Sequence, residues 1–380
     1  MPARGQKPGQ RTAAAGTPMD WAGYVDGLII QHGSLAAVCE RLGGIRGYRE
    51  DVESVGRALR RLRGRASLSG GAWGERLLRT FGLPQPVAAR LRFMGQYHSR
   101  FVDLPLPLAT DLVQLWDRPP TSESRIGRLW LSLARVTLAL RADDADDAAT
   151  HLAPAAAVAS DDPVGRIEVA LCAAMLESRG DPATVPAALE SVPALLAQLD
   201  GGDAAAGDGD CLRARYVGQV AHALNRAGDV NRALALHLEL PDGAATHPFA
   251  RSRRANGVAY GLFRRGERDA ALASARRAAT FAGDAGHVRL RAMALLMVAR
   301  VAGDGAEAGE ARARARAIGQ ALADPILLAR CDAADRASHR LAPEGGEADE
   351  PKARRERGAR DEASAPLPDP LPASRGEGED

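Results

Sequence analysis

The chain has 380 residues, a formal net charge of +2 and 46% apolar residues, with aromatic residues at only 4%. This length allows two or three domains, and the alanine-rich apolar content favours close-packed helices over a β-sheet. The only two lysines are Lys7 and Lys352. A P-loop or a Schiff-base enzyme is therefore not expected, because both need a lysine inside the folded part of the chain.

The small net charge hides blocks of opposite sign. Residues 41–100 hold thirteen Arg and four acidic residues, residues 101–210 hold seven Arg and eighteen acidic residues, and residues 211–340 hold twenty-one Arg and twelve acidic residues. Such blocks can steer partners of opposite charge. The four Cys include no C-x-x-C pair and the eight His show no metal-ligand spacing. We therefore expect no metal site and no cofactor, in a reducing cytoplasm.

The first predicted elements lie in a short tail and a basic region. Residues 1–19 are rich in Gly, Pro and Ala and are predicted to be disordered. Residues 20–65 contain three predicted helices. The first is Trp21–His32, the second follows Gly33-Ser34 and stops at Gly43-Gly44, and the third spans Glu50–Arg65.

The second and third of these helices resemble a helix-turn-helix. Ala37 would lie at the helix crossing and Gly43 would open the turn. One face of the third helix is apolar, through Val52, Val55, Leu59 and Leu62. The opposite face presents three candidates for contacts with DNA phosphates or base edges, namely Arg57, Arg60 and Arg61. The alternative is a structural helical bundle with a solvated arginine face.

Residues 66–123 are predicted to be a helical connector. Its helices cover "GERLLRTFGL", the run from Pro86 to Phe101, and "LPLATDLVQLW". His98, Ser99 and Asp103 are close in sequence, but neighbours on one helix seldom converge as a catalytic triad. We expect them to have capping and surface roles.

Two acidic clusters could suggest cation sites. One is Asp143, Asp144, Asp146 and Asp147, which we assign to a helix start, where acidic side chains favour the helix dipole. The other, Asp200–Asp210, lacks the Glu that a calcium loop requires and is predicted to loop out as a linker.

Residues 124–340 contain a repeat. "AHALNRAGDVNRAL" at Ala221–Leu234 recurs as "AYGLFRRGERDAAL" at Ala259–Leu272, and glycines follow at positions 228, 266 and 303. Glycine suits the left-handed position that ends a helix. Each unit is thus a predicted helical hairpin, and such hairpins must stack to bury their apolar faces. Four or five hairpins would fill this span.

This pattern of Ala, Leu, Gly and Ala resembles the tetratricopeptide repeat family. The resemblance implies an all-α protein: a right-handed α-solenoid of stacked helical hairpins preceded by a small helical N-terminal region. It also implies a concave groove lined by the first helix of each pair. The groove residues would be Arg215, His222, Asn225, Arg226, Arg253, Asn256, Tyr260, Phe263 and Arg264.

The predicted groove suits a protein or peptide partner that is acidic or polar, although its arginines could equally serve only to solvate a helix face. Residues 341–380 are charged and Pro-rich and are predicted to be a disordered tail. We therefore expect a cytoplasmic bacterial scaffold or adaptor with no catalytic residues and no membrane partner. It would act as a transcriptional regulator if the basic helices bind DNA, and as a purely structural scaffold if they do not. The third alternative is an enzyme with no recognisable motif.

Overall fold

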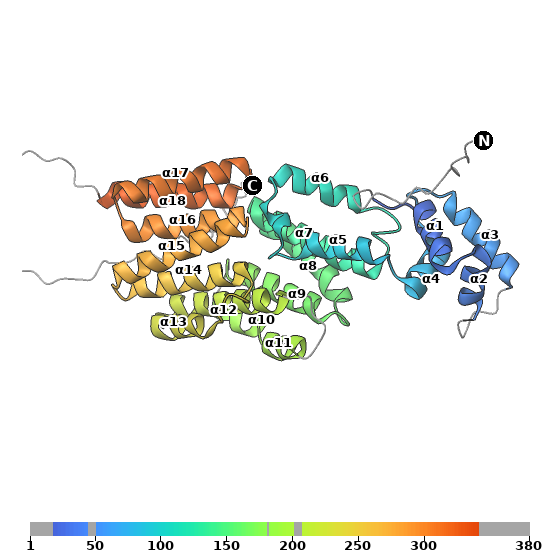
Figure 1. Ribbon diagram of the computed structural model, residues 1–380, viewed down its shortest axis with the longest axis horizontal. Helices are drawn as coiled ribbons and strands as arrows, with labels where there is room; N and C mark the ends of the chain where they lie inside the picture. The colour runs from blue at the N-terminus through green and yellow to red at the C-terminus, as the bar shows by residue number, and fades with distance from the viewer. Residues whose placement is uncertain (1–17, 45–50, 181, 201–206, 342–380) are drawn as a thin grey trace, which may run out of the picture.

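The computed structural model describes residues 18–44, 51–180, 182–200 and 207–341. These residues form helices joined by short turns, and none of them lies in a β-strand. The predicted all-α class is thereby confirmed for the described part of the chain. Figure 1 shows an elongated molecule with the N-terminal helices at one end. The two predicted tails fall almost wholly outside the described residues.

The basic N-terminal region is a small helical unit. It contains α1 (Trp21–His32), α2 (Leu35–Gly43) and α3 (Val52–Arg63), and α4 (Gly71–Phe81) follows. The first three helices each begin at a side chain that accepts a hydrogen bond from the backbone N–H three residues on, and these caps are Asp20, Ser34 and Asp51. Trp21 and Tyr24 are fully buried where α1 meets its neighbours.

Two details of the predicted helix-turn-helix differ from the structure. Val52 was expected on the apolar face of α3 but is 46% exposed, because it is the first residue of the helix; Val55, Leu59 and Leu62 are buried. Ala37 is only half-buried, and α2 instead buries Val38, Cys39 and Leu42. The predicted turn falls on residues 45–50, which lie outside the described residues.

One helix of the connector is shorter than predicted. It contains α5 (Gln85–Gly95), the 3-10 helix η1 (Arg100–Asp103) and α6 (Leu106–Trp116). The helix predicted to run on to Phe101 stops at Gly95, where a Cβ atom would lie 2.4 Å from the Trp130 carbonyl oxygen. Beyond that crossing, Gln96 adopts an extended backbone. The segment that follows carries Tyr97 and His98 into the interior.

The rest of the described chain consists of helices that pack against their sequence neighbours. The bounds are α7 (Arg125–Ala142), α8 (Ala145–Val158), α9 (Pro163–Glu177), η2 (Pro182–Thr184), α10 (Val185–Ala188), α11 (Val192–Asp200), α12 (Asp208–Arg226), α13 (Val230–Glu239), α14 (Pro248–Arg264), α15 (Arg268–Asp284), α16 (Val288–Ala302), α17 (Ala306–Ala321) and α18 (Pro325–Leu341). The interfaces from α14 onward are rich in buried alanines, such as Ala259, Ala275 and Ala315. Small side chains let the helix backbones approach closely.

The predicted glycine turns are confirmed. Gly228, Gly266 and Gly303 have φ of 87°, 83° and 77° and connect α12 to α13, α14 to α15 and α16 to α17. The acidic stretch Asp200–Asp210, in contrast, does not loop out over its whole length. Its last residues form the first turn of α12, since Asp208 makes tertiary contacts that hold it there.

Replacing Gly228 with Ala should lower the free energy of unfolding by about 1–2 kcal/mol. A Cβ at this position would touch nothing within 4 Å, so the cost comes from the left-handed backbone alone. Gly309→Ala is the matched control, because Gly309 lies within α17 and also has open space for a Cβ; this change should be neutral or stabilising. Urea denaturation measures both. Equal effects would show that the turn at Gly228 tolerates any residue.

The last helices return to contact the middle of the chain. The Leu106 N–H donates to the Leu322 carbonyl at 2.8 Å, and the Arg289 N–H donates to Asp103 at 2.7 Å. Helix α18 also contacts α7. These contacts join residues that are separated by 180 or more positions along the chain. They enclose a cavity between the last helices and the middle of the chain.

An arginine-lined cavity as candidate functional site

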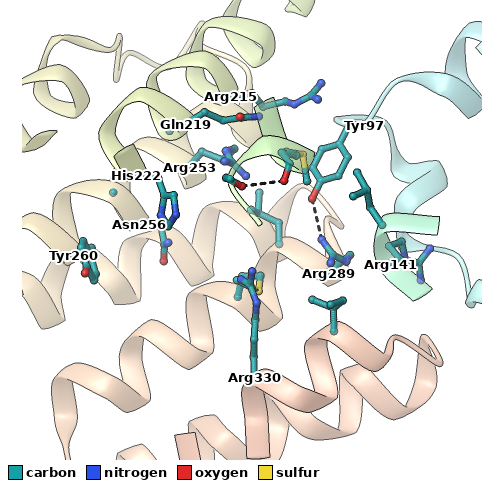
Figure 2. A pocket seen from close by; sticks show the side chains of 18 of the residues that line it. Tyr97, Arg141, Arg215, Gln219, His222, Arg253, Asn256, Tyr260, Arg289 and Arg330 are labelled. Carbon is teal, nitrogen blue, oxygen red and sulfur yellow. Dashed lines mark hydrogen bonds between the residues drawn. The ribbon is translucent and has the colours of Figure 1, made fainter. Parts of the chain in front are cut away.

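The cavity has a volume of about 720 Å³, within the range of small-molecule and cofactor sites. Side chains from α7, α9, α12, α14, α16 and α18 line it, together with Tyr97 from the segment between α5 and η1. In Figure 2 these side chains converge from several helices on one space. The N-terminal helices α1 to α4 contribute no residue to this lining.

Eight of the nine predicted groove residues line this cavity. They are Arg215, His222, Asn225, Arg226, Arg253, Asn256, Tyr260 and Arg264. Phe263 does not, because it lies on another face of α14, where it packs against the alanine-rich core. Residues three or four apart, such as Arg253, Asn256 and Tyr260, share a face of a helix, whereas sequence neighbours such as Phe263 and Arg264 point in different directions. Arg264 also donates to the Tyr260 hydroxyl at 3.1 Å.

Sequence reasoning missed Tyr97, which lies at the most cationic end of the cavity. Its hydroxyl oxygen accepts a hydrogen bond from Arg289 at 3.0 Å, and the Arg215 guanidinium lies 4.7 Å from its ring centroid. Burial acts to raise the pKa of the Tyr97 phenol, but Arg289, Arg253 and the other nearby arginines outweigh this and lower it. No local pattern in the sequence distinguishes Tyr97 from a surface tyrosine.

A buried network holds Arg215 in place. Arg215 is 2% exposed and pairs at 2.5 Å with Glu168, which is fully buried. Glu168 also lies 3.4 Å from His98, whose other ring nitrogen lies 3.1 Å from Asp208. Arg92 and Gln96 donate to the same Asp208 carboxylate at 2.7 and 3.0 Å. The charge of Arg215 is therefore compensated within the protein.

The residues of the expected surface cluster are thus separated. His98 lies in the network, Ser99 donates to the Phe93 carbonyl at 2.5 Å, and Asp103 caps the start of α16 through the Arg289 N–H. They do not converge, and Ser99 and Asp103 act as caps, as expected. The expected surface role is wrong for His98, which is 6% exposed because Glu168 and Asp208 hold its ring in the interior. Within the described residues no group of His, Cys, Asp and Glu could hold a metal ion.

A second buried acid, Asp324, bridges two arginines of the cavity. It is fully buried and accepts from Arg141 at 3.1 Å and from Arg289 at 2.7 Å. It also caps α18 by accepting from the Leu327 N–H at 3.0 Å. Arg141 is 1% exposed, and its Nη1 has no hydrogen-bond partner.

Arg253 and Arg330 differ from these paired arginines. Neither forms an ion pair with a carboxylate of the described residues, and Arg330 makes only a 3.4 Å contact with the Met293 sulfur. Burial lowers the pKa of both side chains, and Arg289 lowers each further. Gly218 makes room for Arg253, because a Cβ there would lie 2.9 Å from its Nη2.

The other end of the cavity is polar and carries Arg226 and Arg264 beside neutral side chains. Asn225 and Asn256 from successive helix pairs each have a buried side-chain oxygen without a hydrogen-bond partner. His222, Asn256 and Tyr260 lie on the side of the cavity away from Arg289 and Arg141 (Figure 2). Unsatisfied buried oxygens of this kind can accept hydrogen bonds from a bound molecule.

The three candidate DNA-binding residues lie elsewhere. Arg57, Arg60 and Arg61 are all exposed on α3, on the side opposite the buried Val55 and Leu59. Arg57 donates to the Ser54 hydroxyl on the same helix at 3.1 Å. The structure places these arginines together on a surface but does not connect them to the cavity.

The described residues form an all-helical protein with a cavity that several arginines line. No helix of the described residues has the length and apolar character needed to cross a bilayer. In comparisons with known proteins, the chain matched no family model, no curated protein and no solved structure.

Proposed function

We propose that this chain is an α-solenoid of the tetratricopeptide type that binds an acidic or polar peptide in its cavity. The observation that carries the proposal is that α12, α14, α16 and α18, the helices that alternate along the chain, all contribute residues to one cavity. The spacing of the turn glycines supports the repeat. The proposal gives the chain a binding role and no catalytic one.

The lining chemistry supports a peptide ligand. An extended peptide offers backbone N–H groups at regular intervals, which suit the free oxygens of Asn225 and Asn256. The arginines then match acidic side chains, because guanidinium groups bind carboxylates through two parallel hydrogen bonds. Tyr260 adds a partly apolar surface.

Replacing Asn256 and Tyr260 together with Ala should weaken the binding of acidic peptides at least about tenfold, since each lost hydrogen bond or contact contributes on the order of 1 kcal/mol. Fluorescence anisotropy of labelled hexapeptides that alternate Ala with Glu measures this, with Ala–Gln peptides for comparison. Arg268→Ala is the control, since Arg268 is exposed on α15 outside the cavity. Binding that is equal for Glu and Gln peptides, or unchanged in the double variant, would contradict the proposal.

A second function is favoured by the exposed arginine face of α3, which is compatible with a regulator that binds DNA. Replacing Arg57, Arg60 and Arg61 with Ala should weaken duplex binding and reduce the slope of log affinity against log salt by up to about 3, or roughly 0.9 for each phosphate contact. The fold should survive, because Val55, Leu59 and Leu62 are untouched.

The control for this measurement is a variant with Ala at Arg265, Arg268 and Arg276, which are exposed at the other end of the molecule. It removes the same charge but should leave the slope unchanged. If the intact chain retains no duplex at low salt, the DNA-binding function is rejected and a scaffold without nucleic acid remains.

A further inference from the structure

We infer that the cationic end of the cavity is a subsite for a phosphate monoester in its doubly charged form. The subsite consists of Arg253, Arg330, Arg289 and Tyr97. The inference rests on the proposed function, because it takes the cavity as the ligand site. It deepens that function by naming the charged group that the bound molecule carries.

Positive charge exceeds negative charge around Tyr97. Five arginines of the lining lie at this end, namely Arg141, Arg215, Arg253, Arg289 and Arg330. Three carboxylates lie among them: Glu168 pairs with Arg215, Asp324 bridges Arg141 and Arg289, and Asp103 faces His287 and accepts from the Arg289 backbone N–H. Two positive charges are left over, which matches the charge of a phosphate monoester and exceeds that of a single carboxylate.

Three arginines from different helices and the Tyr97 hydroxyl surround the same space. Arg253 comes from α14, Arg289 from α16 and Arg330 from α18, and their side chains extend toward the space beside Tyr97 (Figure 2). The Tyr97 oxygen accepts from Arg289, which leaves its own proton to be donated into the cavity. Guanidinium groups bind phosphate oxygens through paired hydrogen bonds, and several donors from different helices surround a tetrahedral group better than a planar one.

Without a bound anion, the arginines at this end of the cavity repel one another. Like charges held close together in a half-buried site repel one another, and burial adds a further cost for each charge. Arg253 and Arg330 have no carboxylate partner among the described residues, and each lies near Arg289. A dianion would relieve this repulsion and accept hydrogen bonds from Arg253 and Arg330, whose guanidinium groups form no ion pair with a carboxylate of the described residues.

Isothermal titration of the full chain at pH 8 tests the subsite with three small probes: methyl phosphate, dimethyl phosphate and acetate. Methyl phosphate carries two charges at this pH, since the second pKa of a phosphate monoester is about 6. The other two probes carry one charge. We expect methyl phosphate to bind at least about tenfold more tightly than either. Equal affinity for the three probes, or no binding of methyl phosphate, would overturn the inference.

The variant for the same titration is Arg253→Gln with Arg330→Gln. It should lose methyl phosphate binding by at least about 100-fold, while Arg268→Gln on the surface of α15 should not change it. The double variant should also be no less stable than the parent chain, because it removes two uncompensated charges. If it unfolds more easily, those arginines are structural and the subsite is rejected. Arg330→Lys keeps the charge without the paired donors and should show an intermediate loss.

Two further ligands identify the source of the phosphate: free O-phosphoserine and a blocked Ala–Ala–phosphoserine–Ala–Ala peptide. Tighter binding of the peptide assigns the subsite to a phosphorylated peptide, and tighter binding of the free amino acid assigns it to a small phosphorylated molecule. If Ala–Glu peptides bind but the phosphate probes do not, the inference fails and the proposed function stands. If methyl phosphate binds and neither peptide does, the inference stands and the peptide function fails.

Discussion

Replacing Asp324 with Asn should lower the free energy of unfolding by about 3–5 kcal/mol. Asp324 is fully buried and accepts from Arg141 and Arg289 while it caps α18. Without its charge, two arginines of the interior lose their compensation, and breaking a buried ion pair in this way has costs of this order. Urea denaturation followed by circular dichroism measures the effect.

Asp335→Asn, within the helix that Asp324 caps, is the matched control. Asp335 is 38% exposed and pairs with Arg312 and Arg316 on the protein surface. Pairs of this kind contribute about 0–1 kcal/mol, so the control should barely change the midpoint of unfolding. Comparable losses in the two variants would mean that Asp324 acts as an ordinary cap and not as the bridge between α18 and α7.

Replacing Glu168 with Gln should cause the second large loss, again about 3–5 kcal/mol. Glu168 is fully buried and holds both Arg215 and His98. Burial acts to raise the pKa of its carboxyl, but Arg215 and His98 outweigh this and lower it. The variant leaves Arg215 without its carboxylate partner. Glu307→Gln, which breaks an exposed pair with Arg276, is the control and should leave the midpoint of unfolding almost unchanged.

The pH dependence of the free energy of unfolding is an independent test of the network around Glu168 and His98. Burial acts to lower the pKa of His98, but its contacts with Asp208 and Glu168 outweigh this and raise it above 6.5. The stability contributed by His98 is therefore fully present below about pH 6.5 and is lost as the pH rises through the pKa of the folded state. This loss should be smaller in Glu168→Gln and absent in His98→Gln. A loss of equal size in all three proteins would show that other groups produce it.

A large part of the cavity could be predicted from the sequence because the repeat is local. The turn glycines at 228 and 266 set the position of each first helix, and the helical period then decides which residues share its inner face. Asn225, Asn256 and Tyr260 were located in this way. Phe263 was assigned wrongly because an aromatic residue near that face also fits a core position, and only the packing of α14 against the alanine-rich core separates the two.

The sequence by itself thus determined the helical class, the turns and the lining contributed by α12 and α14, since these follow from periodicity and from the freedom of glycine at positive φ. The tertiary structure alone decided that Tyr97 and Arg330 lie in the same cavity, and that Asp324 compensates Arg141. These residues are separated by more than 180 positions, and they meet only because α18 returns to α7. The sequence pattern within each helix does not predict the contact between α18 and α7, because that contact depends on how every helix between these two is stacked.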